Sequence, residues 1–93
     1  MMKHPLGEAS KSGDSVADDL RAVFGGNLRA ARLKAGLSQA QVAARTSLTQ
    51  QYVSQVETGH QNITIATMEA LARVVGRNVS VLLRRARGQI KEK

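Results

Sequence analysis

The sequence contains no cysteine, a single proline and very few aromatic side chains. Without cysteine the chain can form neither a disulfide nor a thiolate metal site. Its two histidines, His4 and His60, are far apart in the sequence and do not suggest a metal site. The sequence also lacks an apolar run of membrane-spanning length and an apolar signal core at its start. We therefore expect a cytoplasmic protein that uses no metal or other cofactor.

Acidic side chains are also scarce. Seven Asp and Glu residues stand against fourteen Lys and Arg residues, which gives a net charge of +7. A basic chain of this size favours a polyanionic partner, with nucleic acid before an anionic membrane surface. No Ser/His/Asp set, no plausible pair of catalytic carboxylates and no glycine-rich phosphate loop is present, so we expect no enzyme.

Charge and apolar residues are unevenly spread along the chain. Residues 1–19 carry four acidic and two basic side chains, whereas residues 77–93 carry six basic and one acidic. Residues 1–18 are polar and contain the only proline, so burial cannot offset their ordering entropy. The sequence therefore predicts a flexible N-terminal segment at 1–18, one domain at 19–87 and a basic tail at 88–93.

From about Asp19 onward the apolar spacing is helical, and no segment of useful length alternates with period two. We expect an all-α, compact five-helix domain with short connections. In the first helix the pair Gly25 and Gly26 is expected to weaken the first turns, and Gly36 is expected to end it. The expected inward residues of the five helices are, in chain order, Phe24, Leu28, Ala31 and Ala35; Val42, Ala43 and Thr46; Tyr52, Val53 and Val56; Ile65, Met68, Leu71, Ala72 and Val75; and Val79, Leu82, Leu83 and Ala86.

Capping residues mark where these helices begin. Ser38, with Gln41 three residues later, forms the pattern of a capping box. Thr49, Thr64 and Asn78 are the expected N-caps of the third, fourth and fifth helices.

The third expected helix, within TQQYVSQVETG (49–59), is almost uncharged in an otherwise basic chain. At 100° per residue, its three glutamines and Ser54 fall on one arc of about 140°, opposite its apolar residues. Glutamine offers a donor and an acceptor together, which matches the major-groove edge of adenine. Basic residues elsewhere could bind phosphates and so position the protein. A polar outer face is also the ordinary state of a surface helix, so this helix by itself leaves both interpretations open.

The wider pattern resembles the helix-turn-helix of the Cro and phage-repressor (XRE) family of DNA-binding regulators. The matching stretch is QAQVAARTSLTQQYVSQVET (39–58), and the resemblance extends over about residues 20–86. Its features include Gln39 opening the first of the two helices, the small Ala43 where they cross, and the Glu57-x-Gly59 ending. Ser47 stands where the family usually has glycine, and a left-handed serine costs on the order of 1 kcal/mol.

The resemblance implies a recognition helix and a set of DNA contacts. The residues it implies at base edges are Gln50, Gln51 and Gln55, and Ser54 is expected at a base edge or, alternatively, at a phosphate. Those implied or expected at phosphates are Gln39, Thr49, Arg45, His60, Asn62 and Thr64. It also implies a partly buried ion pair between Arg32 and Glu57, which both lie at the margin of an apolar stripe.

Two classes of function remain open at this point. The first is a sequence-specific regulator that binds double-stranded DNA. The alternative is an antitoxin or other protein-interaction module with a partner such as a toxin, although neither end of the chain is strongly apolar. Within the first class, HQNITIATMEAL resembles controller proteins of restriction–modification systems.

One short recognition helix offers few base contacts, so we expect a homodimer on a near-palindromic operator. Val74 and Val81 lie off the inward stripes of the last two expected helices, and Ile90 would join them if the fifth helix continued. These three residues are the predicted dimer interface.

Overall fold

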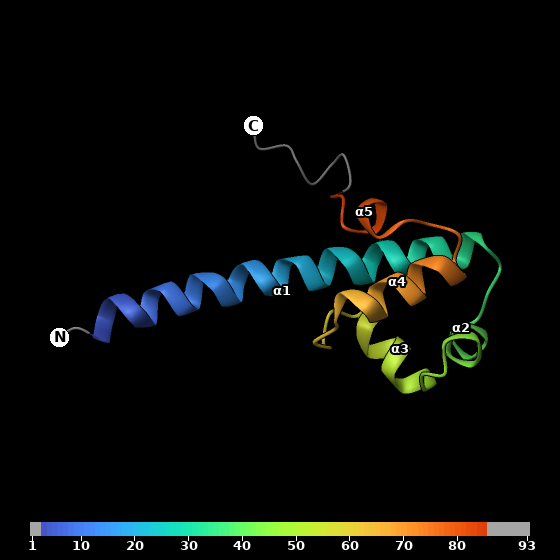
Figure 1. Cartoon of the computed structure of the whole chain (residues 1–93), viewed down its shortest axis with the longest axis horizontal. Coiled ribbons are helices and arrows are strands. Elements are labelled where there is room, and N and C mark those ends of the chain that lie inside the picture. The colour runs from blue at the N-terminus through green and yellow to red at the C-terminus, as the bar shows by residue number, and fades with distance from the viewer. Residues whose placement is uncertain (1–2, 86–93) are drawn as a thin grey trace.

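The computed structural model describes the backbone of residues 3–85 and the side chains of residues 16–85. Within this part the chain is all-helical, which confirms the predicted fold class. The helices are α1 (Lys3–Lys34), α2 (Gln39–Thr46), α3 (Gln50–Glu57), α4 (Ile65–Val74) and α5 (Val79–Leu82). Helix α1 contacts α3 and α5, and α4 contacts α2 and α5 (Figure 1).

A single apolar core holds the C-terminal half of α1 to the four shorter helices. Its largest fully buried side chains are Phe24, Leu28, Val42, Val53, Leu71 and Leu82, and they come from all five helices. Leu37, Leu48, Tyr52, Met68 and Val79 pack against this core from partly buried positions. The helical spacing in the sequence thus identifies most of the core.

Two residues expected in the core are exposed, and those two expectations were wrong. Ile65, the first residue of α4, exposes 65% of its surface because it lies in the first turn, at the end of the apolar stripe. Ala35 lies beyond the last residue of α1, in the turn that Gly36 closes with a φ of 75°, so it leaves the stripe of that helix. Ala86 lies outside the described residues.

The predicted dimer interface is described only in part. Val74 and Val81 are half-buried, and Val74 packs against the core of its own chain. Ile90 lies outside the described residues. This interface therefore stays a prediction.

Helix α1 begins at Lys3, well before the start near Asp19 that the sequence suggests. The predicted boundary between residues 18 and 19 therefore falls inside one continuous helix. Pro5 is compatible with this helix because it lies in the first turn, where a backbone N–H has no intrahelical partner. The low apolar content of residues 1–18 obscured the helical pattern. The flexibility expected of this segment stays a prediction.

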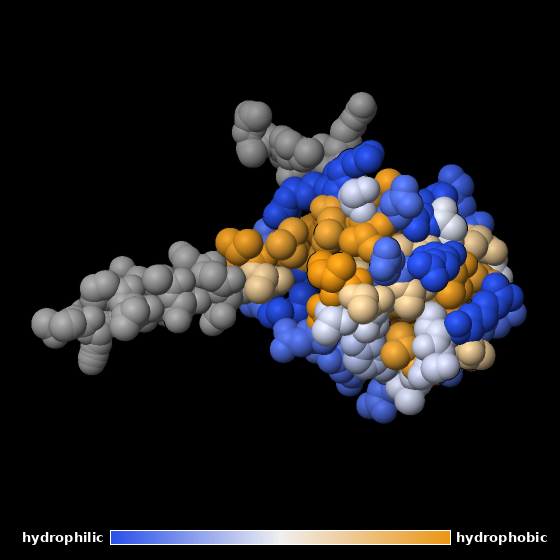
Figure 2. All heavy atoms as spheres, viewed as in Figure 1, coloured by the Kyte–Doolittle hydropathy of each residue, from blue (hydrophilic) through white to orange (hydrophobic). Residues whose placement is uncertain are grey.

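Large apolar side chains are exposed where α1 joins the rest of the domain. Figure 2 shows an apolar surface at this junction. Val16 and Leu20 expose 60% and 42% of their surface, and Leu33, further along the same helix, exposes 52%. The core-facing stripe of α1 that carries Phe24 therefore continues outward at Leu20, one turn earlier, whereas Leu33 lies on the opposite side of the helix.

Gly25 lies where α1 crosses the end of α3. A Cβ atom added at Gly25 would lie 2.1 Å from the backbone oxygen of Val56 and 2.9 Å from that of Glu57. Only a residue without a side chain allows this approach of one backbone to another. Gly26, the next residue, has no neighbouring atom within 4 Å of such a Cβ. The two glycines of α1 therefore differ: the first is required by packing, and the second is not.

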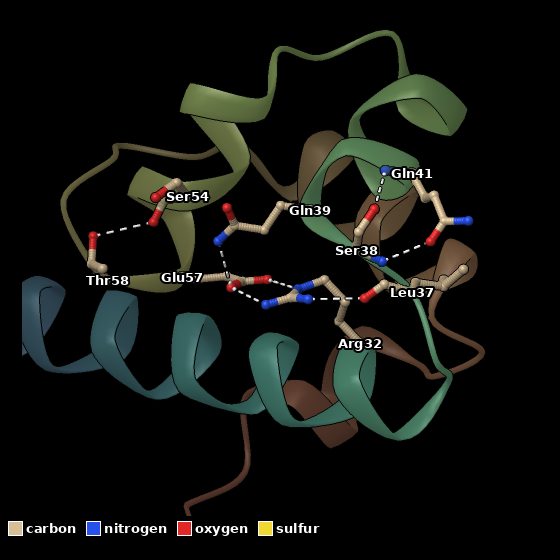
Figure 3. Close-up of polar contacts among 8 residues, drawn as sticks. All are labelled: Arg32, Leu37, Ser38, Gln39, Gln41, Ser54, Glu57 and Thr58. Atoms are coloured by element: carbon tan, nitrogen blue, oxygen red, sulfur yellow. Dashed lines mark hydrogen bonds and ion pairs between the residues drawn. The ribbon is translucent and has the colours of Figure 1, made fainter.

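A buried ion pair joins the same two helices. Arg32 donates from Nε to Oε2 of Glu57 at 2.6 Å and from Nη2 to Oε1 at 3.1 Å, and both residues are buried (Figure 3). Nη1 of Arg32 also donates to the backbone oxygen of Leu37 at 2.9 Å, and Nε2 of Gln39 donates to Oε1 of Glu57 at 3.0 Å. The hydrogen bond to Glu57 raises the pKa of Arg32 above its ordinary value, outweighing the opposite effect of burial.

We predict that Arg32→Ala destabilises the fold by roughly 3 kcal/mol, because it leaves the Glu57 carboxylate buried without its charged partner. Replacing both Arg32 and Glu57 should cost less than the two single changes added together. Urea unfolding of the four proteins of the double-mutant cycle measures this coupling. Strictly additive losses would show that the two side chains do not stabilise each other.

We predict opposite effects at the two adjacent glycines. Gly26→Ala should stabilise the fold by about 0.5–1 kcal/mol, because alanine is the better helix former and meets no atom. Gly25→Ala should instead destabilise it by about 1–3 kcal/mol, because the new Cβ forces α1 and α3 apart. Thermal and urea unfolding of the matched pair test this, and equal stabilisation at both positions would contradict the close approach.

Candidate nucleic-acid interface

Helices α2 and α3 form a compact pair joined by a tight turn. Ser38 and Gln41 form the capping box at the start of α2, with Oγ of Ser38 accepting from the Gln41 N–H at 3.0 Å and Oε1 of Gln41 accepting from the Ser38 N–H at 2.8 Å (Figure 3). Ser47 ends α2 in the left-handed conformation, with a φ of 60°, as the resemblance to the family requires of this position. The turn is therefore made despite the absence of glycine.

Helix α3 separates an apolar face from an amide face. Val53 and Val56 are buried, and Tyr52 packs against the core from a half-buried position. Gln50 and Gln51 are exposed at the start of the helix. Thr49 caps α3 by accepting the Tyr52 N–H on Oγ1 at 3.0 Å. The cap and the buried valines fix how the two glutamines are presented to solvent.

Ser54 and Gln55, the other two predicted base-contacting residues, are half-exposed on the same helix. Oε1 of Gln55 accepts a 2.7 Å hydrogen bond from Nε2 of Gln61 in the α3–α4 loop. In this arrangement one of the two acceptor positions of the Gln55 amide oxygen is occupied by Gln61, whereas Gln50 and Gln51 can each offer a donor and an acceptor. The hydrogen bond between Gln61 and Gln55 was not predicted, because the sequence shows only that the loop residues are polar.

The predicted phosphate-contacting residues surround α3. Arg45 is exposed in the last turn of α2, and Gln39 is half-buried at the first position of that helix. The amide group of Gln39 is held by Glu57, so its backbone N–H, which has no intrahelical partner at this position, is the better anion donor. Sequence reasoning did not foresee that Gln39 extends the Arg32–Glu57 network.

The α3–α4 loop and the start of α4 hold the remaining predicted phosphate contacts. His60 Nδ1 lies 2.9 Å from Oγ1 of Thr58, and Oδ1 of Asn62 accepts from Nη1 of Arg21 on α1 at 2.8 Å. Thr64 caps α4 by accepting the Thr67 N–H at 3.1 Å. All three predicted residues, His60, Asn62 and Thr64, are exposed. The predicted base and phosphate residues thus lie on α2, on α3, in the links that flank α3 or at the N-cap of α4.

The amide face carries little charge of its own. Between residues 39 and 64 the only Lys or Arg is Arg45, and the only carboxylate, Glu57, is bound to Arg32. The exposed basic residues Arg29, Lys34, Arg73, Arg77 and Arg84 lie on α1, on α4 or near α5. The face can therefore accept hydrogen-bonding groups without burying an unpaired charge of its own.

Other kinds of site find no support in the described residues. There, no group of three or more His, Cys, Asp or Glu side chains is arranged to hold a metal ion. Within the same part of the chain, none of the helices combines the length and the apolar character needed to cross a bilayer.

Sequence comparison places the chain among known regulators. The helix-turn-helix family model matches residues 28–82. The uncharacterized HTH-type transcriptional regulator y4dJ of Sinorhizobium fredii is 40% identical over 58 residues, which cover 62% of this chain and 75% of the relative.

Solved structures agree with this assignment. The hypothetical transcription factor NHTF from Neisseria superimposes with a TM-score of 0.71 at 34% identity, covering 83% of this chain and 88% of that one. The restriction-modification controller protein C.AhdI from Aeromonas hydrophila gives a TM-score of 0.63 at 32% identity, covering 67% and 94%. With the family match spanning more than half of the sequence, the chain belongs to the XRE-type helix-turn-helix family of DNA-binding transcriptional regulators.

Proposed function

We propose that this regulator reads double-stranded DNA in the major groove with residues 50–58. The observation that carries the proposal is the amide face of α3, set on a helix whose opposite face packs into the core through the buried Val53 and Val56. Two exposed glutamines at the start of the helix, Gln50 and Gln51, suit bidentate hydrogen bonds to adenine. Gln55, with its oxygen bound to Gln61, suits a base edge that offers acceptors. Ser54 lies on the same face and completes the proposed set.

We propose that the groups around α3 bind the DNA backbone and set the orientation of the helix. These are the Arg45 side chain, the N-terminus of α2 at Gln39, the hydroxyls of Thr49 and Thr64, and the loop residues His60 and Asn62. Backbone contacts of this kind position a protein without reading sequence. With one full positive charge among these residues, the local salt dependence of binding should be small.

The proposed activity is DNA binding alone, in the cytoplasm, with no catalytic step. Similarity to C.AhdI over 94% of that protein favours a controller-type regulator within the family. An antitoxin is the other candidate, and it would carry a protein partner in addition to DNA. Co-purification with the products of the neighbouring genes separates the two, because a toxin bound in stoichiometric amount would favour the antitoxin.

We also propose that two copies bind a near-palindromic operator. The reading face offers four side chains to bases, and each good contact discriminates by about 1–3 kcal/mol. This is little specificity against the many competing sites of a genome, and a second copy would double the number of contacts. Two-fold symmetry in the protein would then be matched by two-fold symmetry in the operator.

The first prediction for DNA binding compares two kinds of contact. Gln50→Ala and Gln51→Ala should each weaken binding to the selected operator by about 1–3 kcal/mol and leave binding to random DNA almost unchanged. Arg45→Ala should instead weaken both and lower the slope of log affinity against log salt by about 1. Fluorescence anisotropy titrations over a range of salt measure all three variants. Equal losses on both DNAs for the glutamine variants would reject base reading.

The second prediction concerns the operator. Selection from random DNA should return two inverted half-sites whose centres lie about 34 Å apart, one helical turn of DNA. Sedimentation of the complex should give two chains per operator. A full-length operator saturated by one chain would show that the protein acts as a monomer.

A further inference from the structure

The α3–α4 loop begins with two backbone hydrogen bonds that fold it against the end of α3. Gly59, with a φ of 79°, donates its N–H to the Val56 oxygen at 3.1 Å, and His60 donates its N–H to the Gln55 oxygen at 2.9 Å. This pair of bonds is the Schellman arrangement, in which the glycine takes the left-handed conformation. The backbone of His60 therefore lies beside that of Gln55, and the next residue, Gln61, starts close to the amide face of α3.

The other side of Gln61 is held by α1. Arg21 on α1 donates from Nη1 to Oδ1 of Asn62 at 2.8 Å. This bond uses the acceptor of Asn62 and does not engage its Nδ2 donor, so it is compatible with the phosphate contact proposed above. Gln61 thus lies between a residue tied to α3 and a residue tied to α1, and its place in the loop is set from both sides.

From this place Gln61 bonds one of the proposed base-reading amides. Its Nε2 donates to Oε1 of Gln55 at 2.7 Å, in a hydrogen bond that is partly buried. The oxygen and the nitrogen of an amide lie on opposite sides of the side chain. A bond that holds the oxygen of Gln55 toward the loop therefore places its Nε2 donors on the side away from Gln61.

The direction of an amide decides which base edge it can read. The last torsion of a glutamine is broad and roughly two-fold, so the exposed Gln50 and Gln51 can turn either their oxygen or their nitrogen toward a base. In the major groove guanine and thymine offer acceptors at O6, N7 and O4, whereas cytosine offers a donor at N4. An amide that is held by its oxygen, as in Gln55, favours guanine or thymine over cytosine.

We propose that Gln61 is a positioning residue that determines specificity, because it acts through Gln55 and sets which base edge Gln55 reads. This inference rests on the DNA-binding mode proposed above. It gives a loop residue outside α2 and α3 a part in base selection, and Gln61 needs no contact with DNA to have this effect.

Two substitutions at position 61 should hold the Gln55 amide in opposite directions. A lysine side chain has only donors, so Gln61→Lys should keep the direction seen in the structure. An ionised glutamate has only acceptors, so Gln61→Glu should accept from Nε2 of Gln55 and turn the Gln55 oxygen toward DNA. Gln61→Ala removes the bond. The backbone bonds of the loop do not use the Gln61 side chain, so all three variants should fold, and circular dichroism and urea unfolding check this.

Selection from random DNA measures the base preference of each variant, and Gln55→Ala identifies the operator position that Gln55 reads. There, the unmodified chain and Gln61→Lys should prefer guanine or thymine over cytosine, and Gln61→Glu should reverse this order. Gln61→Ala should reduce the discrimination by about two- to tenfold, the range for loss of one neutral hydrogen bond. Positions read by Gln50 and Gln51 should not change.

Two controls separate positioning from other effects. Gln41→Glu adds the same charge in the first turn of α2 and keeps the capping box, because glutamate also accepts the Ser38 N–H. Its effect on affinity should be the same for all sequences, and a preference shifted as in Gln61→Glu would overturn the assignment. In the Gln55→Ala background, substitutions at Gln61 should no longer alter base preference. If they still do, Gln61 contacts DNA directly and does not act through Gln55.

The outcomes also separate this inference from the function on which it rests. If the unmodified chain selects an operator and all three Gln61 variants keep its preference at the Gln55 position, DNA reading stands and Gln61 has no positioning role. A preference of the unmodified chain that follows Gln61→Glu instead of Gln61→Lys would overturn the assigned direction. If the unmodified chain prefers no sequence over random DNA, the proposed function is rejected and this inference with it.

Discussion

The carboxylate of Glu57 is the point on which the arrangement of the helices depends. It accepts two hydrogen bonds from Arg32 and one from Gln39, and Arg32 also donates from Nη1 to the Leu37 carbonyl. One buried group thereby joins α1, the link after α1, α2 and α3. A buried pair of charges adds little net stability compared with apolar residues of the same volume, but it is costly to satisfy in any other arrangement. Its contribution is to specify how α3 sits on α1.

The close approach at Gly25 acts on the same end of α3. Glu57 is the last residue of this helix, and its backbone oxygen, with that of Val56, lies against Gly25 of α1. A side-chain network and a backbone contact therefore fix one turn of α3 from two directions. The exposed glutamines lie at the other end of this short helix, so their position follows from these two constraints. In the DNA-binding mode proposed above, DNA would meet an amide face that is already in place, which reduces the ordering cost of binding.

Local signals in the sequence were enough to predict most of the fold. These signals are the capping box at Ser38, the threonine caps and the apolar spacing. Each depends only on residues three or four positions apart, so it does not require knowledge of how the helices pack. The family resemblance added the pairing of Arg32 with Glu57, which are 25 positions apart and could not be joined by spacing alone. What the sequence could not supply were contacts between elements. The role of Gly25, the bond between Gln55 and Gln61, and the second role of Gln39 each require knowing which backbone lies opposite.

The early start of α1 was missed for a related reason. A helix that leaves the domain has no core to face, so its sequence carries no strong apolar stripe to reveal it. Asn78 shows that a correctly predicted position does not ensure the expected bond. It occupies the N-cap position of α5 without making a side-chain capping hydrogen bond. The position of Asn78 before an apolar stripe correctly predicted where α5 begins. It did not predict whether the Asn78 side chain would form a capping hydrogen bond to this four-residue helix.

The distance between the reading face and most of the positive charge has a kinetic consequence. Long-range attraction acts on the whole +7 chain, yet the exposed arginines of α4 and of the residues around α5 are not on the amide face. In the DNA-binding mode proposed above, first encounters would often be made in orientations that do not present α3, and the molecule would have to rotate before α3 reached the groove. Because the amide face carries little charge of its own, a site whose bases do not match its amides would hold that face only weakly in this mode.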